Sequence, residues 1–256
     1  MDVTSEVRLT ETRSFPPSAE FAAQANVDAS IYAAANADPV AFWERAAARL
    51  DWVEPWHTAH TWSPPVQGEG GLSVPEATWF AGGTLNVAVN CVDRHVDAGR
   101  GDKVALFFEG EPGDRFAVSY AELQRRVARA ANGLIALGIV PGDRVVVYLP
   151  VLVETVVIAL ACARIGAVHS LVFGGFSAEA VRFRLEDTRA KLLVTTDGQN
   201  RRGAQVEVKS AADVAAHGLP DLEHVLVVRR TGQDVPWTAG RDVWWHDAID
   251  TQPDVH

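Results

Sequence analysis

Two segments of this sequence contain residue types suited to binding an anion. The first is Phe-Gly-Gly-Phe-Ser at 173–177, which lies between an expected strand and an expected helix. Its paired glycines allow a ligand to approach the backbone closely, and the helix start behind Ser177 offers N–H donors and partial positive charge. The same residues also suit a plain strand–helix turn capped by Ser177, and they match neither glycine-rich nucleotide fingerprint. Both interpretations of this segment remain open.

The second segment is Asp-Gly-Gln-Asn-Arg-Arg-Gly at 197–203, directly after another expected strand. Arg201 and Arg202 stand beside the flexible Gly203. Guanidinium groups form charged, two-pronged contacts with phosphate, so this loop is a candidate phosphate site. The alternative is a solvated surface loop. The basic pair is the more informative because the chain as a whole is acidic.

The remaining clusters of polar residues favour structural roles. Asp93, Arg94 and His95 share one expected helix, where we interpret the first two as anchors and His95 as a hydrogen-bonded interface residue. The chain contains no zinc-ligand spacing and no nucleophile motif of the hydrolases. The sequence therefore predicts no catalytic residue and no metal ligand in this chain. A dinucleotide-binding dehydrogenase is poorly supported, because no Gly-x-Gly-x-x-Gly follows a strand.

Short apolar strands alternate with helices from about residue 102 onward. This alternation is typical of an α/β fold, a parallel sheet with helices on both faces, in which the strand C-termini meet at one ligand-binding edge. A hairpin is expected around Glu111–Asp114, and Ser119 with Glu122 forms a capping box for the first long helix. The further expected strands are 144–149, 168–173, 191–196 and 224–228, and the further expected helices are 153–165, 178–187 and one opened by Ser210.

The first hundred residues differ from the rest. Residues 1–25 are polar and suggest an extended arm, and Asp38-Pro39 opens a helix. Residues 51–83 are rich in Trp, Pro and Gly and predict an irregular loop pinned to a core. A further helix is expected over 85–98, ending at Gly99. We therefore divide the chain into a helical, Trp-rich N-terminal extension (1–100) and an α/β domain (101–256).

Composition narrows the class of protein. The 256 residues include 23 basic and 33 acidic side chains, a net charge of −10, and 48% hydrophobic residues. This balance argues against a broad nucleic-acid surface. The most apolar run, 151–163, contains Glu154 and is too short for a membrane span, so no membrane partner is expected. Two cysteines without paired spacing and no signal-peptide pattern favour the cytoplasm. The oligomeric state is left undetermined.

Several stretches, in this order, resemble the AMP-forming acetyl-CoA synthetase family. The resemblance extends over nearly the whole chain. The matching stretches are Ser14–Pro17, Trp79–Asn86, Asn90–His95, Gly142–Arg144, Ala161–Ser170, Phe173–Ser177, Asp197–Gly203 and Arg241–Trp245.

The resemblance implies a two-step reaction and a role for the two anion-binding segments. In this family, acetate attacks the α-phosphate of ATP to give acetyl-adenylate and pyrophosphate, and the thiol of coenzyme A (CoA) then displaces AMP. The matches place Gly175 and Arg201 at the CoA nucleotide, with Arg202 and Gly203 in the same loop near the 3′-phosphate. Ala204 departs from the family pattern, since relatives commonly carry a basic residue there.

The family also has parts that this sequence lacks. The phosphate loop ending in lysine, the acyl pocket, the Mg²⁺ site and the C-terminal domain with its catalytic lysine are not found before His256. We therefore expect ATP and Mg²⁺ to bind only in a complete enzyme, with this chain as its N-terminal portion. The alternative is a truncated paralogue that binds CoA or a partner without catalysis.

Overall fold

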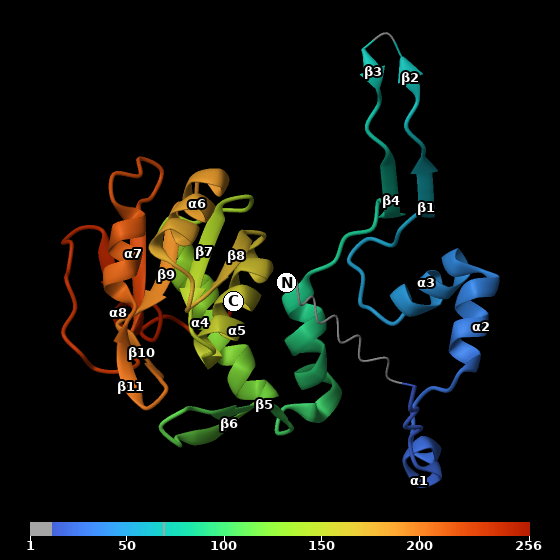
Figure 1. The fold of residues 1–256 in the computed structure, drawn as a ribbon, viewed down its shortest axis with the longest axis horizontal. Helices are drawn as coiled ribbons and strands as arrows, with labels where there is room; N and C mark the ends of the chain where they lie inside the picture. Colours follow the sequence, from blue (N-terminus) through green and yellow to red (C-terminus); the bar gives the residue numbers. More distant parts are fainter. Residues whose placement is uncertain (1–11, 69) are drawn as a thin grey trace, which may run out of the picture. The chain divides into compact units, whose positions relative to one another are not determined.

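The computed structural model describes residues 12–68 and 70–256, which form two compact units. One unit is made of the described residues up to Leu50 together with those of Thr58–Ala81, and the other of Asp51–His57 and Gly82–His256. Figure 1 labels most of their elements along the chain. None of the described helices has the length and apolarity required to cross a membrane.

The first unit contains three short helices and two strand pairs. Its elements are α1 (Ala19–Ala23), α2 (Ser30–Ala37), α3 (Pro39–Ala47), β1 (Thr58–Ser63), β2 (Gln67–Gly68), β3 (Gly71–Leu72) and β4 (Glu76–Ala81). As expected, Asp38 caps α3, accepting the N–H of Ala41 at 2.9 Å. The unit has little core, since Ala47 is the one buried residue among its described positions.

Part of the expected irregular loop is instead an antiparallel pair. Strands β1 and β4 align His60 with Trp79, whose rings lie 4.2 Å apart between centroids. Such pairing depends on residues far apart in the sequence, and this stretch lacks the clean alternation that would announce it. Nor is the arm before residue 25 wholly extended, since Ser18 caps α1.

The second unit is built on a parallel sheet, as the sequence predicted. Its strand order, β13-β12-β9-β7-β8, and the edge strand β13 were not predicted. A separate hairpin, β5–β6, precedes it and a second, β10–β11, follows β9. The strands are β5 (Val104–Glu109), β6 (Arg115–Ser119), β7 (Arg144–Leu149), β8 (Val168–Phe173), β9 (Leu192–Thr196), β10 (Gly198–Arg201), β11 (Ala204–Glu207), β12 (His224–Val228) and β13 (Asp242–Trp244). The helices are η1 (Val89–Asp93), η2 (Val96–Arg100), α4 (Tyr120–Ala136), α5 (Val153–Ile165), α6 (Ala178–Thr188), α7 (Lys209–Ala216) and α8 (Trp245–Ala248).

Helices cover both faces of this sheet, as expected (Figure 1). Alternate residues of β7 point to opposite faces: Val145 and Val147 pack with α4 and α5, whereas Val146 and Tyr148 pack with α6 and α7. Two cores thus lie on either side of one sheet, and they hold the carboxyl ends of its strands in a fixed row.

Three local expectations differ from the structure. The helix expected over 85–98 contains the π-helical segments η1 and η2, and Gly99 adopts a φ of 74° within η2. Helix α7 begins at Lys209 with Val208 as its cap, so Ser210 lies inside the first turn, where it donates to Glu207 at 2.8 Å. The segment 197–203 is also no open loop, because β10 and β11 make it a hairpin.

Candidate functional site

A cavity of about 420 Å³ lies in the second unit, at the end of β7 and β8 where ligands of such folds bind. One wall comes from the β5–β6 hairpin and another from residues 150–152, between β7 and α5. The first anion-binding segment contributes Phe173 and the second contributes Gln199, Asn200 and Arg201. The sheet therefore brings both sequence-predicted segments to one edge.

Gly175 and Arg201 are direct neighbours. A Cβ atom built on Gly175 would lie only 2.7 Å from Nη1 of Arg201, so the absence of a side chain lets the guanidinium lie against this backbone. In residues 12–68 and 70–256, the Arg201 guanidinium has no hydrogen bond or ion pair. A positive charge free of an internal partner, next to bare backbone, is suited to an anionic ligand.

The Gly-Gly segment is held in place by two side chains from buried positions. Gln199 Nε2 donates to the carbonyl of Gly174 at 3.0 Å, and the Tyr148 hydroxyl donates to the carbonyl of Phe176 at 2.9 Å. Burial raises the pKa of Tyr148, which keeps the phenol a neutral donor. Gly174 lies against the backbone of β7, since a Cβ there would be 2.8 Å from Pro150 N. The segment is thus held in a fixed position beside the cavity, which its first residue, Phe173, lines.

Arg202 and Gly203 form the two-residue turn between β10 and β11. Both have left-handed backbone, with φ of 54° and 75°. Such turns favour Asn-Gly, and an Arg-Gly pair is a weak hairpin signal, which explains why the sequence did not predict it. Gly203 N–H donates to Glu111 Oε1 at 2.8 Å. The structure therefore places Arg201 on the cavity wall and the other two residues at the adjacent turn.

The site also includes a residue that sequence reasoning missed. Arg230 lines the cavity and donates to both carboxylate oxygens of Asp114, at 2.7 and 3.0 Å. These hydrogen bonds from Arg230 hold the pKa of Asp114 below its usual value and raise that of Arg230. The signal was present in the sequence, since Arg230 follows strand β12 as Arg201 follows β9.

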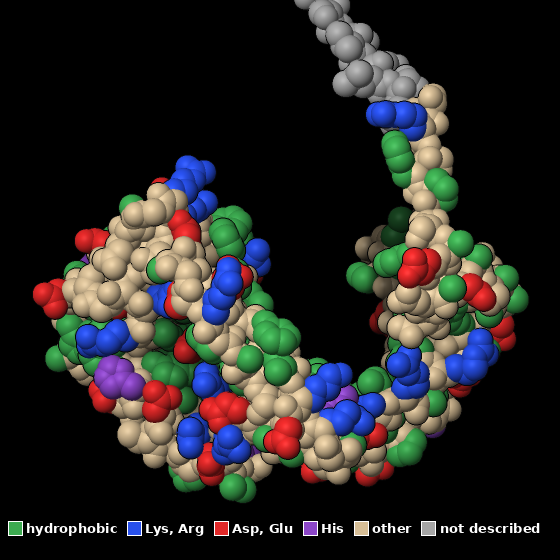
Figure 2. Space-filling model, turned by 90° about the horizontal axis from the view of Figure 1, so that it is seen from below, with side chains coloured by type: hydrophobic (Ala, Val, Ile, Leu, Met, Phe, Trp, Pro, Cys, Tyr) green, Lys and Arg blue, Asp and Glu red, His purple; other side chains and the backbone are tan. Residues whose placement is uncertain are grey.

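A second cavity, of about 330 Å³, lies between α4, α5 and α8. Arginine and acidic side chains line it together, and Glu122 pairs there with Arg125 and Arg126. Arg126 and Arg129 pair with carboxylates here and Arg229 lies over the ring of Trp244, so the arginines of this cavity already have partners within the fold, which makes it a weaker candidate for an anion than the cavity at Arg201. On the face drawn in Figure 2, basic and acidic side chains are interspersed over the described surface of the α/β unit.

The Asp93 cluster is structural, as predicted. Asp93 accepts two bonds from Arg164 Nη2 at 2.7 Å and one from Gln124 at 3.0 Å, which ties η1 to α5 and α4. Both side chains of the Asp93–Arg164 pair are nearly buried. Cys162 is buried as well, and this burial raises the pKa of its thiol to about 12. A thiol held neutral in this way is a packing residue.

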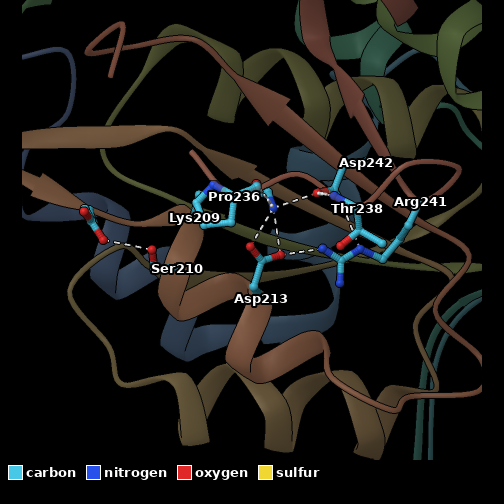
Figure 3. A network of polar contacts seen from close by, with 8 residues as sticks. Lys209, Ser210, Asp213, Pro236, Thr238, Arg241 and Asp242 are labelled. Atoms are coloured by element: carbon cyan, nitrogen blue, oxygen red, sulfur yellow. Dashed lines mark hydrogen bonds and ion pairs between the residues drawn. The ribbon is translucent and has the colours of Figure 1, made fainter. Parts of the chain in front are cut away.

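A charged cluster beside β13 forms a third polar feature (Figure 3). Lys209 is fully buried, and its ammonium contacts Asp242 at 2.8 Å, Asp213 at 2.7 Å and the carbonyl of Pro236 at 3.1 Å. Arg241 pairs with both aspartates. Burial alone would raise the pKa of Asp242, but the bonds from Arg241 and Lys209 outweigh it and lower that pKa. These charges satisfy one another inside the fold.

Comparison with known proteins decides the family. Residues 92–255 match the family of AMP-binding enzymes, and residues 29–91 match the acetyl-coenzyme A synthetase N-terminus. The chain belongs to the AMP-binding enzyme family. The family match covers the sheet, its helices and both segments of the candidate site.

Relatives of this chain include two proteins named acetyl-coenzyme A synthetase. The protein of Streptomyces avermitilis is 54% identical over 97% of this chain, and that of Mycolicibacterium smegmatis is 51% identical over 94%. The chain spans 37% and 25% of these two proteins. Among solved structures, the acetoacetyl-CoA synthetase from Streptomyces lividans aligns with a TM-score of 0.72 at 28% identity, over 84% of this chain and 31% of its own.

Proposed function

We propose that this AMP-binding enzyme chain serves an acetate–CoA ligase that makes acetyl-CoA, AMP and pyrophosphate from acetate, ATP and CoA. Acetate first displaces pyrophosphate from ATP to form acetyl-adenylate, and the CoA thiol then displaces AMP. The support is the similarity, at about half of all positions, to acetyl-coenzyme A synthetases over nearly the whole chain. We place this reaction in the cytoplasm, with these small molecules as its partners.

Within that reaction, we assign the 420 Å³ cavity to the nucleotide end of CoA. The observation that carries the assignment is the contact between the bare backbone of Gly175 and the guanidinium of Arg201, which has no hydrogen bond or ion pair among the described residues. The 3′-phosphate of CoA is a compact dianion that a guanidinium binds through two parallel hydrogen bonds. Arg202 adds a second positive charge at the adjacent turn, where Ala204 provides none.

ATP and Mg²⁺ belong to the same proposal but not to residues of this chain. When bound, Mg²⁺ neutralises developing charge on the phosphates of ATP. Among the described residues, His, Cys, Asp and Glu side chains form no group of three that could hold a metal ion. In this proposal the stretches that match the family belong to the CoA end of the reaction, so we give the residues of this chain no role at Mg²⁺ and none as catalytic groups. The task of these residues is to bind and orient CoA.

Calorimetric titration of the chain with CoA and with dephospho-CoA tests the assignment. Arg201→Ala removes a charge-assisted contact of roughly 1.5–3 kcal/mol, so CoA affinity falls about ten- to a hundredfold while dephospho-CoA affinity changes little. Arg125→Ala is the matched control, because it removes one positive charge from an exposed pair on α4. Equal losses for both ligands in Arg201→Ala would remove the 3′-phosphate role.

A non-catalytic CoA-binding protein is the second candidate, since the CoA assignment involves no reacting group. Acetate-dependent exchange between ATP and pyrophosphate separates the two. We expect the 256-residue chain to show none, because the phosphate-binding groups are not among its residues. Measurable exchange by this chain would contradict the proposal that ATP binds to groups outside it. CoA binding without exchange in the whole protein would favour the non-catalytic role.

A further inference from the structure

The carboxylate of Asp197 lies fully buried at the edge of the sheet and is bound almost entirely by backbone. Its Oδ1 accepts N–H groups from Gly198 at 2.7 Å, Arg230 at 2.7 Å and Thr231 at 3.0 Å. Its Oδ2 accepts the N–H of Gly232 at 2.7 Å. Four backbone dipoles thus converge on one negative charge, as they do around a bound anion.

These bonds join two segments that are distant in sequence. Gly198 opens the β10–β11 hairpin that carries Arg201, whereas residues 230–232 follow strand β12. A further bond, from Gln233 Nε2 to the carbonyl of Asp197 at 3.0 Å, closes the same junction. The packing is tight, because a Cβ on Gly198 would lie 1.9 Å from Gln233 Nε2. A shift of either segment must therefore move the other.

This junction, between Asp197–Gly198 and residues 230–233, is connected to the cavity through a side chain from each of the two segments that it joins. From one segment, the Arg230 side chain crosses to Asp114 of the β5–β6 hairpin. From the other, Gln199 holds the carbonyl of Gly174 beside Gly175. Asp197 itself does not line the cavity, yet the residues on either side of its junction do.

We propose that Asp197 is a positioning residue for CoA: its backbone-bound carboxylate fixes the β10–β11 hairpin so that Arg201 meets the 3′-phosphate beside Gly175. This inference rests on the proposed function. The proposal depends on the donors to Asp197 being uncharged. Because backbone N–H groups satisfy this carboxylate, it does not take the Arg201 guanidinium as its partner, and that guanidinium stays available to the phosphate of CoA.

Asp197→Asn tests the role with little change in shape. The asparagine amide nitrogen is a donor and would face the N–H of Gly232 or Arg230, so one side of the junction loses its acceptor. Asp143→Asn is the matched control. Asp143 is also buried and accepts from Val140 N–H at 3.0 Å and Lys191 at 2.9 Å, but it lies before β7, at the opposite end of the strands.

Amide hydrogen exchange and calorimetric titration with CoA are measured on the 256-residue chain and its variants, at a temperature where all of them are folded. In Asp197→Asn, we expect backbone amides of β10 and β11 to exchange hydrogen at least tenfold faster and CoA affinity to fall at least tenfold. Selectivity for CoA over dephospho-CoA should fall with it. Asp143→Asn should leave the exchange of the hairpin, the affinity and the selectivity within about twofold, although it lowers stability.

The outcomes separate this inference from the proposed function. If the wild-type chain binds no CoA, the assignment of the cavity to CoA fails, and the hydrogen-exchange comparison alone decides whether Asp197 positions the hairpin. If Asp197→Asn binds CoA with unchanged selectivity, Asp197 is not a positioning residue and the function stands. Should Asp197→Asn not fold, Gln233→Ala weakens the same junction by one hydrogen bond. It should then lower CoA affinity about threefold, and an unchanged affinity would overturn the inference.

Discussion

Asp197 and Asp242 are buried aspartates of the same sheet, but different donors satisfy them. Asp242 takes its bonds mainly from cations, Lys209 at 2.8 Å and Arg241 at 2.6 Å (Figure 3). Asp197 takes its bonds from neutral donors, the Thr196 hydroxyl and several backbone N–H groups. Near β13, Lys209 and Arg241 are paired with aspartates inside the fold, and these pairs contribute to stability. At the cavity the carboxylate is satisfied without a cation, which leaves Arg201 available to a ligand.

The largest effect should come from breaking the Lys209 cluster. Lys209→Ala leaves Asp242 and Asp213 with one cation fewer in a buried setting, which costs roughly 3–5 kcal/mol of unfolding free energy. Urea unfolding measures the loss. Lys103→Ala, at an exposed lysine, should change stability by no more than about 0.5 kcal/mol.

The same variant sharpens the comparison between the two regions. The folded fraction of Lys209→Ala should bind CoA within about threefold of the wild type, because the cluster does not line the cavity. A loss of CoA affinity as large as that of Arg201→Ala would show that the two regions act as one.

The two glycines of the first segment should respond differently to a methyl group. Gly174→Ala drives a Cβ against the backbone of Pro150 and should cost about 1–3 kcal/mol of stability. Gly175→Ala meets the end of the Arg201 side chain, which can move, so stability changes little while CoA affinity falls about three- to tenfold. Thermal unfolding and calorimetry distinguish them. A stability loss in Gly175→Ala equal to that in Gly174→Ala would contradict the assigned contact.

Acid should weaken the ion-paired carboxylates. For both Asp143 and Asp242, burial opposes the charge, but hydrogen bonds and nearby cations lower the pKa overall. A lowered pKa in the folded state means that this stability is present above about pH 4 and is lost as pH falls through the folded pKa. Urea unfolding between pH 6 and pH 3 should show this loss. Asp242→Asn should be less stable at pH 6 and show a shallower decline; an unchanged slope would exclude Asp242 as a contributor.

The smallest effect concerns Glu111, whose carboxylate accepts from Gly203 beside the proposed phosphate site. Glu111→Gln keeps an acceptor for that N–H but removes a negative charge near the ligand. CoA should bind about two- to fivefold more tightly, with little change for dephospho-CoA, since exposed charges interact weakly. Glu186→Gln is the control, because Glu186 pairs with Arg182 on α6 and does not line the cavity. Weaker CoA binding by Glu111→Gln would mean that Glu111 orders the turn rather than repelling the phosphate.

Sequence patterning was most informative where structure is local. Ser119 and Ser177 cap the helices that follow them, as predicted, and the alternating apolar strands form the expected parallel sheet. It was least informative where pairing is long-range or weakly marked. The β1–β4 pair and the β10–β11 hairpin were not predicted, because neither has a strong turn signal or clean alternation.

For the candidate site, too, the sequence predicted some residues and not others. Gly175, Arg201, Arg202 and Gly203 were identified from residue types and a family resemblance. The partners that position them, Gln199 and Arg230, were not, because their roles depend on contacts between strand ends far apart in the chain.

The sequence by itself determined the α/β class, the family and the chemical character of the two anion-binding segments. These follow from periodicity, motif order and side-chain type, all of which are local properties of the chain. Only the tertiary structure decided which cations are free. Lys209 and Arg201 look alike as charges in a sequence, yet one is buried among aspartates and the other lies unpaired, within the described residues, beside Gly175. That difference arises because packing of the sheet and its loops sets the neighbours of each charge.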